Sequence, residues 1–166
     1  MITPRWLAWA RAEIGTREVV GAQHNPHVLD YWRLGHVPLT VSDDETPWCA
    51  AFACAALEEA GVRSPRTPRA RGFESGATLT PCDARLGAIV VLSSERGAAS
   101  GHVGFLTGVA PGQLILLGGN QGNRVCEAPF PASKLVSMCW PVGGGDWHLY
   151  PRAPTVGAGG HSVSDG

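Results

Sequence analysis

The stretch TPWCAAFACAALEEAG, residues 46–61, is the most extended helix pattern in this chain of 166 residues. A proline is well tolerated at the first helical position, and a threonine before it can accept a hydrogen bond from a free helix N–H. Alanine favours the helix interior, and Gly61 is suited to the left-handed residue that ends a helix. We therefore expect a helix over residues 47–60, capped by Thr46, with Cys49 at its third position.

The same start signal recurs earlier and later in the chain, at Thr3-Pro4, Asn25-Pro26 and Thr67-Pro68. Gly15 and Gly35 supply further stops. The sequence therefore predicts helices over residues 4–14 and 26–34 and a shorter helix over residues 68–75.

The second half of the chain is typical of strands. Short apolar or alternating runs are separated by turn residues such as Pro111-Gly112. We expect strands over residues 88–93, 102–109, 114–117, 124–128 and 135–140. Helices followed by an antiparallel sheet indicate an α+β fold. Residues 1–150 are predicted to form one domain, and the Gly/Ser-rich residues 151–166 are expected to be a flexible tail.

Composition restricts the class of protein. A formal net charge of −1 gives no reason to expect binding to nucleic acid. No apolar run is long enough to span a membrane, and the first twelve residues do not resemble a signal peptide. Five cysteines, an odd number without a CxxC pair, argue against a complete disulfide framework or a zinc ribbon. We expect a monomer.

Cys49 is a candidate nucleophile because of its place near the start of a helix. Unpaired backbone N–H groups and the helix dipole there favour a thiolate and could hold an oxyanion. Most cysteines, however, are buried packing residues, and that interpretation stays open for Cys49 on this evidence. The other four, Cys54, Cys82, Cys126 and Cys139, are expected to be packing thiols.

His102 is the candidate base. It begins a predicted strand, and Gly101 and Gly104 beside it leave room for a substrate. In a hairpin with its turn near Pro111-Gly112, residue 102 pairs with the region 118–121. A carboxamide from Asn120 or Gln121 would then reach one ring nitrogen of His102 and fix its tautomer.

Three motifs together resemble the NlpC/P60 and CHAP superfamily of papain-like peptidoglycan hydrolases: TPWCAAF (46–52), GHVGF (101–105) and LGGNQGN (117–123). The resemblance covers roughly residues 5–141, including Glu13 and Glu18 in an N-terminal pattern to which we assign structural roles, with Glu18 near the cleft. It implies a papain-like fold.

The resemblance also implies Cys49 as nucleophile, His102 as general base and Asn120 as the third member, with Gln121 as its alternative. Gln121 and Gly101 are expected to line the substrate groove, as is Trp48, for which core packing is an equal alternative. Many CHAP relatives carry Glu where this chain has Gly118, so an acidic orienter of His102 is absent from that place.

The function implied is hydrolysis of an amide in the peptide part of peptidoglycan, without metal or organic cofactor. A phage lysin and a secreted antibacterial effector with an immunity protein both fit a wall hydrolase that acts outside the cytoplasm. Alternatives are a Cys-His amidase or acyltransferase acting on another amide, and a non-catalytic wall-binding module. Metal sites at His24/His27 with Cys82-Asp83, or at Asp43-Asp44-Glu45, have only weak motif support.

Overall fold

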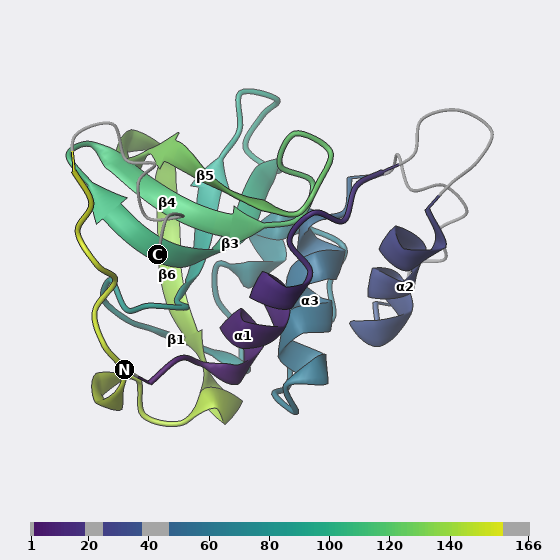
Figure 1. Cartoon of the computed structure of the whole chain (residues 1–166), viewed down its shortest axis with the longest axis horizontal. Coiled ribbons are helices and arrows are strands. Elements are labelled where there is room, and N and C mark those ends of the chain that lie inside the picture. The colour runs from purple at the N-terminus through teal and green to yellow at the C-terminus, as the bar shows by residue number, and fades with distance from the viewer. Residues whose placement is uncertain (1, 19–24, 38–46, 158–166) are drawn as a thin grey trace.

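The computed structural model describes residues 2–18, 25–37 and 47–157 (Figure 1). Within these residues the helices are α1 (Arg5–Ala12), α2 (Pro26–Leu34) and α3 (Cys49–Glu59). The strands are β1 (Leu79–Pro81), β2 (Ile89–Ser93), β3 (Gly101–Ala110), β4 (Gln113–Gly118), β5 (Cys126–Pro131) and β6 (Leu135–Pro141). They form one antiparallel sheet in the order β1-β6-β2-β3-β4-β5. The predicted α+β class is confirmed.

The predicted helix over residues 26–34 has the bounds of α2. The Asn25 side chain accepts a hydrogen bond from the His27 N–H at 2.9 Å, as expected of a cap. Gly35 does not adopt the predicted left-handed conformation, since its φ is −80° and the next residue, His36, has φ 54°. Gly35 instead lies against α3, where a Cβ atom would approach Cys54 Cβ to 2.7 Å.

The start signals Thr3-Pro4 and Thr67-Pro68 give elements with other bounds than predicted. The first helix begins at Arg5, and Pro4 is its N-cap instead of its first helical residue. After Thr67-Pro68 the chain forms only a short 3₁₀-helix, η1 (Ala70–Phe73). The Thr67 hydroxyl accepts from the Arg69 N–H at 3.1 Å, so it closes a local turn that competes with helix formation.

All five predicted strands are present, with ends shifted by up to three residues. The first strand, β1, was missed because three residues that end in proline carry no alternating pattern. The expected hairpin of β3 and β4 pairs Phe105 with Leu117, and this register brings the start of β3 to the segment that follows β4.

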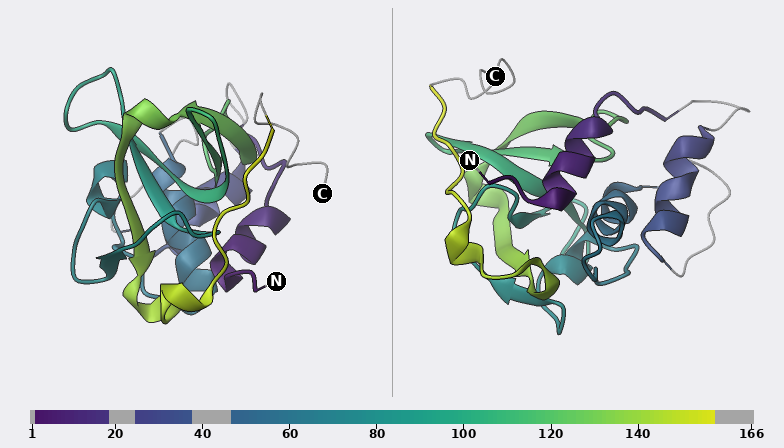
Figure 2. Two further views of the ribbon diagram at one scale, coloured as in Figure 1. Left: turned by 90° about the vertical axis from the view of Figure 1, so that its left-hand side faces the viewer. Right: turned by 60° about the horizontal axis from the view of Figure 1, so that its bottom comes forward.

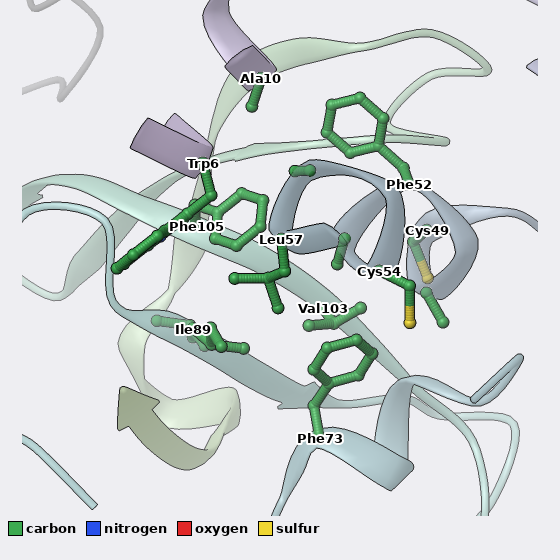
Figure 3. Packing of buried hydrophobic residues seen from close by; sticks show 14 of the residues in the cluster. Trp6, Ala10, Cys49, Phe52, Cys54, Leu57, Phe73, Ile89, Val103 and Phe105 are labelled. Atoms are coloured by element: carbon green, nitrogen blue, oxygen red, sulfur yellow. The ribbon is translucent and has the colours of Figure 1, made fainter. Parts of the chain in front are cut away.

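The central element of the helical layer is α3. Every residue from Cys49 to Leu57 is buried, as expected for a helix that is apolar on all sides. It packs against β3 and β4 of the sheet and against α1 and α2. Figure 2 shows that α3 separates α2 from the sheet. In Figure 3, Leu57 points from α3 toward Val103 and Phe105 of β3.

The predicted flexible tail begins too early. Residues 151–157 run along the sheet, where the Val109 N–H donates to Pro154 O and the Val156 N–H donates to Val109 O. Ala153 is buried there. The composition of these residues does not indicate an ordered segment, because the bonds that hold it are made by the backbone and not by particular side chains. Residues 158–166 lie outside the described part. No helix among the described residues is long and apolar enough to cross a membrane.

Gly119, the residue after β4, lies close against the start of α3. A Cβ atom added there would lie 2.7 Å from both Phe52 Cβ and Trp48 Cζ3. We expect Gly119→Ala to lower the free energy of unfolding by about 1–3 kcal/mol, because rigid neighbours on both sides prevent relaxation. Urea unfolding followed by tryptophan fluorescence measures it. Gly157→Ala, with no atom within 4 Å of the added Cβ, is the control; equal stability of the two variants would contradict the prediction.

Candidate active site

Cys49 lies at the first residue of α3, two residues nearer the helix start than predicted. Trp48 is the N-cap, with φ −126° and ψ 14° and no side-chain capping bond. Thr46, the predicted cap, is outside the described residues. The shift leaves the helix-start argument intact, since backbone N–H groups in the first turn lack intrahelical partners. The Cys49 thiol is buried but lines an open hollow.

Trp48 is fully buried, so of its two predicted roles, groove lining and core packing, the structure supports core packing. Its ring stacks on Tyr31 with centroids 5.8 Å apart and lies against Gly119. Its indole N–H donates to Glu18 Oε1 at 2.9 Å. Glu18 therefore anchors the residue that precedes Cys49, and it lies near the hollow without lining it.

The N-terminal segment is tied to α2 by a second carboxylate. Glu13 Oε1 accepts from the Tyr31 hydroxyl at 2.8 Å and is paired with His27. Burial, opposed by a hydrogen bond with Thr16 and aided by Glu13, raises the pKa of Tyr31 above its ordinary value. Tyr31 therefore stays a neutral donor that helps to hold Trp48 in place.

His102 lies at the start of β3 and is held on two sides. Its ring stacks on Phe130 of β5 with centroids 5.2 Å apart. Its Nε2 is 2.9 Å from Gln121 Oε1. The orienting contact expected from Asn120 is therefore made by Gln121. Phe130 was not predicted as a site residue, because it lies beyond the predicted strand end and only strand pairing brings it near His102.

The hydrogen bonds of Gln121 assign the tautomer of His102. Gln121 Nε2 donates to Leu116 O at 3.2 Å and to Cys126 O at 2.7 Å. Carbonyl oxygens only accept, so the amide nitrogen faces them and Oε1 faces the imidazole. Because Oε1 also only accepts, His102 Nε2 carries the proton. In the neutral ring, the free lone pair is then on Nδ1, the nitrogen left for Cys49.

The side chain of Gln121 occupies space that a side chain at residue 118 would need. A Cβ atom on Gly118 would lie 2.5 Å from Gln121 Oε1, and one on Gly104 would lie 3.4 Å from it. Gln121 is largely buried, yet it lines the smaller of the two hollows at the site, as predicted for it. The polar orienter thus reaches His102 from the turn after β4, through the space that Gly118 leaves open.

Cys49 and His102 perturb each other. Burial alone would raise the pKa of the Cys49 thiol, but hydrogen bonding and charge from His102 outweigh it, helped by the Val103 and Ala50 N–H groups, and the pKa lies below its ordinary value. Burial disfavours imidazolium at His102, yet the Cys49 thiolate and Gln121 raise its pKa. Both shifts favour a thiolate–imidazolium pair.

Three of the other cysteines behave differently. Burial raises the pKa of Cys54 and of Cys139. Burial, with a contribution from Cys139, raises the pKa of Cys82 to about 12. All five cysteines are free thiols. All three pKa values are raised, whereas a nucleophile needs a lowered pKa. The shifts are therefore consistent with the packing role expected of these three cysteines.

A hollow of about 710 Å³ lies over the Cys49–His102 pair. Gly101 and Asn120, both predicted site residues, line it. Gly101 is also required by the sheet, because a Cβ atom there would lie 2.7 Å from Leu92 O. A second hollow of about 440 Å³ shares His102, Asn120 and Phe130 with the first. These three residues therefore stand between two adjoining cavities, a geometry suited to an extended substrate.

The weak metal motifs gain no support. No group of three or more His, Cys, Asp or Glu side chains among the described residues is arranged to hold a metal ion. His27 is paired with Glu13, and Asp83 with Arg85. His24 and the acidic run Asp43-Asp44-Glu45 lie outside the described residues.

Comparison of this chain with models of known protein families and with characterised proteins gives no match.

We expect Cys49 to react with iodoacetamide at neutral pH, because its lowered pKa leaves thiolate below the pH at which an ordinary thiol ionises. In His102→Ala, only burial and the backbone N–H groups still act on the pKa of Cys49. The rate–pH profile of alkylation should therefore move to higher pH, and the rate at pH 7 should fall about tenfold. Peptide mapping by mass spectrometry isolates the Cys49 signal. His148→Ala, which removes an exposed histidine, is the control; an unmoved profile in His102→Ala would contradict the pairing.

Gln121→Ala should lower the rate of Cys49 alkylation at neutral pH several-fold, because His102 loses the hydrogen bond that raises its pKa and fixes its tautomer. Asn120→Ala should leave the rate near that of the wild type. The same peptide mapping measures both variants, and a larger loss in Asn120→Ala would return the orienting role to that residue.

Proposed function

We propose that this protein is a papain-like cysteine hydrolase that cleaves amide bonds. The observation that carries the proposal is the pair formed by Cys49 at the start of α3 and His102 at the start of β3, with their mutually favourable pKa shifts. A wall-binding module without catalysis has no need of a thiol whose pKa is lowered. The resemblance to NlpC/P60 and CHAP hydrolases supports the same chemistry.

The first half of the proposed reaction forms a thioester. His102 Nδ1 takes the Cys49 proton, and the thiolate attacks the amide carbonyl carbon. Backbone N–H groups of the first turn of α3, that of Cys49 among them, stabilise the oxyanion. The imidazolium then returns its proton to the leaving amine, which departs as the carbon–nitrogen bond breaks.

The second half regenerates the enzyme. His102 accepts a proton from water, whose oxygen attacks the thioester carbonyl, and the acid product leaves as Cys49 recovers the proton. Gln121 acts as a positioning residue throughout, since its Oε1 holds the Nε2–H side of the ring. No step requires a metal or an organic cofactor.

The proposed substrate is the peptide part of bacterial peptidoglycan. The resemblance of the TPWCAAF, GHVGF and LGGNQGN segments to wall hydrolases supports this choice. The two adjoining hollows are large enough for residues on both sides of a scissile amide. The corresponding setting is a phage lysin or an exported antibacterial effector, the latter with an immunity protein as partner.

Digestion of purified peptidoglycan tests the function. We expect the wild type to release soluble fragments with new amino groups, and Cys49→Ala to release none, because the thioester cannot form. His102→Ala should be slower by about a hundredfold or more. Mass spectrometry of the fragments identifies the bond.

Cys82→Ser is the matched control, since Cys82 is a half-buried thiol that does not line the hollow. Equal release by the wild type and Cys49→Ala would refute the cysteine mechanism. Cys49-dependent cleavage of unrelated amides, with intact peptidoglycan, would move the substrate away from the wall.

A further inference from the structure

Three cationic residues line the hollow above Cys49, and each comes from a different part of the chain. Arg69 precedes η1, Arg96 lies between β2 and β3, and Lys134 ends the 3₁₀-helix η2 (Ala132–Lys134). Lys134 is the one lysine of the sequence. The fold therefore gathers positive charge at this site, although the whole chain has a net charge of −1.

These cations are not used to hold the described structure together. Arg66, Arg71 and Arg85 are each paired with a carboxylate, on Glu58, Glu74 and Asp83 respectively. Within residues 2–18, 25–37 and 47–157, no ion pair involves Arg69, Arg96 or Lys134. Unpaired cations beside a reactive centre are available to a ligand.

Among the acidic residues, Glu95 lines the same hollow. Among the described residues that line the hollow, three cations and one anion give an excess of positive charge. A concave site with charge of one sign raises the local concentration of ligands of the opposite sign. Arginine in particular binds a carboxylate through two parallel N–H···O bonds.

The rest of the lining is suited to a peptide. Phe130 offers apolar surface, and Ser93, Ser94 and Ser100 offer hydrogen-bonding groups. A peptide with an acidic group therefore matches the hollow better than a small inorganic anion or an apolar chain would.

We propose that this hollow recognises a peptide that carries a free carboxylate close to the scissile amide, so that the enzyme discriminates against the same peptide with that carboxylate amidated. The proposal rests on the proposed function, because it names the substrate class of the same site. It assigns specificity to Arg69, Arg96 and Lys134, none of which takes part in bond cleavage.

A binding measurement tests the proposal separately from catalysis. The Cys49→Ala variant is titrated calorimetrically with a synthetic peptide of the peptidoglycan stem sequence in two forms, with acidic carboxylates free or converted to carboxamides. We expect the free form to bind about tenfold more tightly at low ionic strength. The advantage should shrink as salt is raised, because exposed charges are screened.

Variants then locate the effect. Adding Arg69→Ala, Arg96→Ala and Lys134→Ala together should abolish the preference for the free form, and each alone should reduce it by roughly two- to fivefold. Glu95→Gln should increase the preference. Arg63→Ala is the matched control, since Arg63 is exposed and does not line the hollow.

Equal affinity for the two forms, binding of neither, or a preference that persists in the triple variant would overturn the carboxylate proposal. None of these results bears on bond cleavage, which the digestion of peptidoglycan by wild type and Cys49→Ala decides. If digestion of peptidoglycan does not depend on Cys49 but the binding preference is present, the proposed hydrolase function is refuted and an anionic-peptide binding site remains.

Discussion

The close contact between the first turn of α3 and the end of β4 is the constraint on which the rest of the site depends. Gly119 lies against Trp48 and Phe52 with no space for a side chain. Trp48 is held there by Glu18 and Tyr31. Because Cys49 follows Trp48 and Gln121 lies two residues after Gly119, this packing brings the thiol and the orienter of His102 to the same place. Core packing and chemistry thus use the same residues.

The orienting group is a carboxamide whose own position is fixed. The amide nitrogen of Gln121 donates to two backbone carbonyls, so the amide oxygen points toward His102 Nε2. A neutral orienter adds no negative charge beside the imidazolium. The thiolate of Cys49 therefore supplies the charge that stabilises His102, and the two residues depend on each other more than in a site with an acidic third member. Gly118 is the other half of this arrangement, since any side chain there would displace the carboxamide.

Local charge and net charge have separate consequences in this protein. The whole chain is nearly neutral, because several arginines are neutralised by carboxylates within the fold. Within the described part of the chain, the cations without such partners include Arg69, Arg96 and Lys134, which three separate segments bring to the hollow above Cys49. Net charge therefore gives no reason to expect a strongly anionic partner, while the local charge supports the proposal of a peptide with a single negative group.

The sequence by itself determined the α+β class and most of the elements, and it singled out the cysteine and histidine that the structure brings together. Proline, glycine and alternating apolar residues are local signals, and helices and strands depend largely on local preferences. It misplaced the start of α3 and missed β1, it preferred Asn120 to Gln121, and it did not decide between a groove and the core for Trp48. Those outcomes depend on contacts between residues far apart in the chain: Glu18 with Trp48, Gly118 with the Gln121 side chain, and Phe130 with His102. Only the tertiary structure decided them, because burial and the space around a side chain are created by packing and have no local signature.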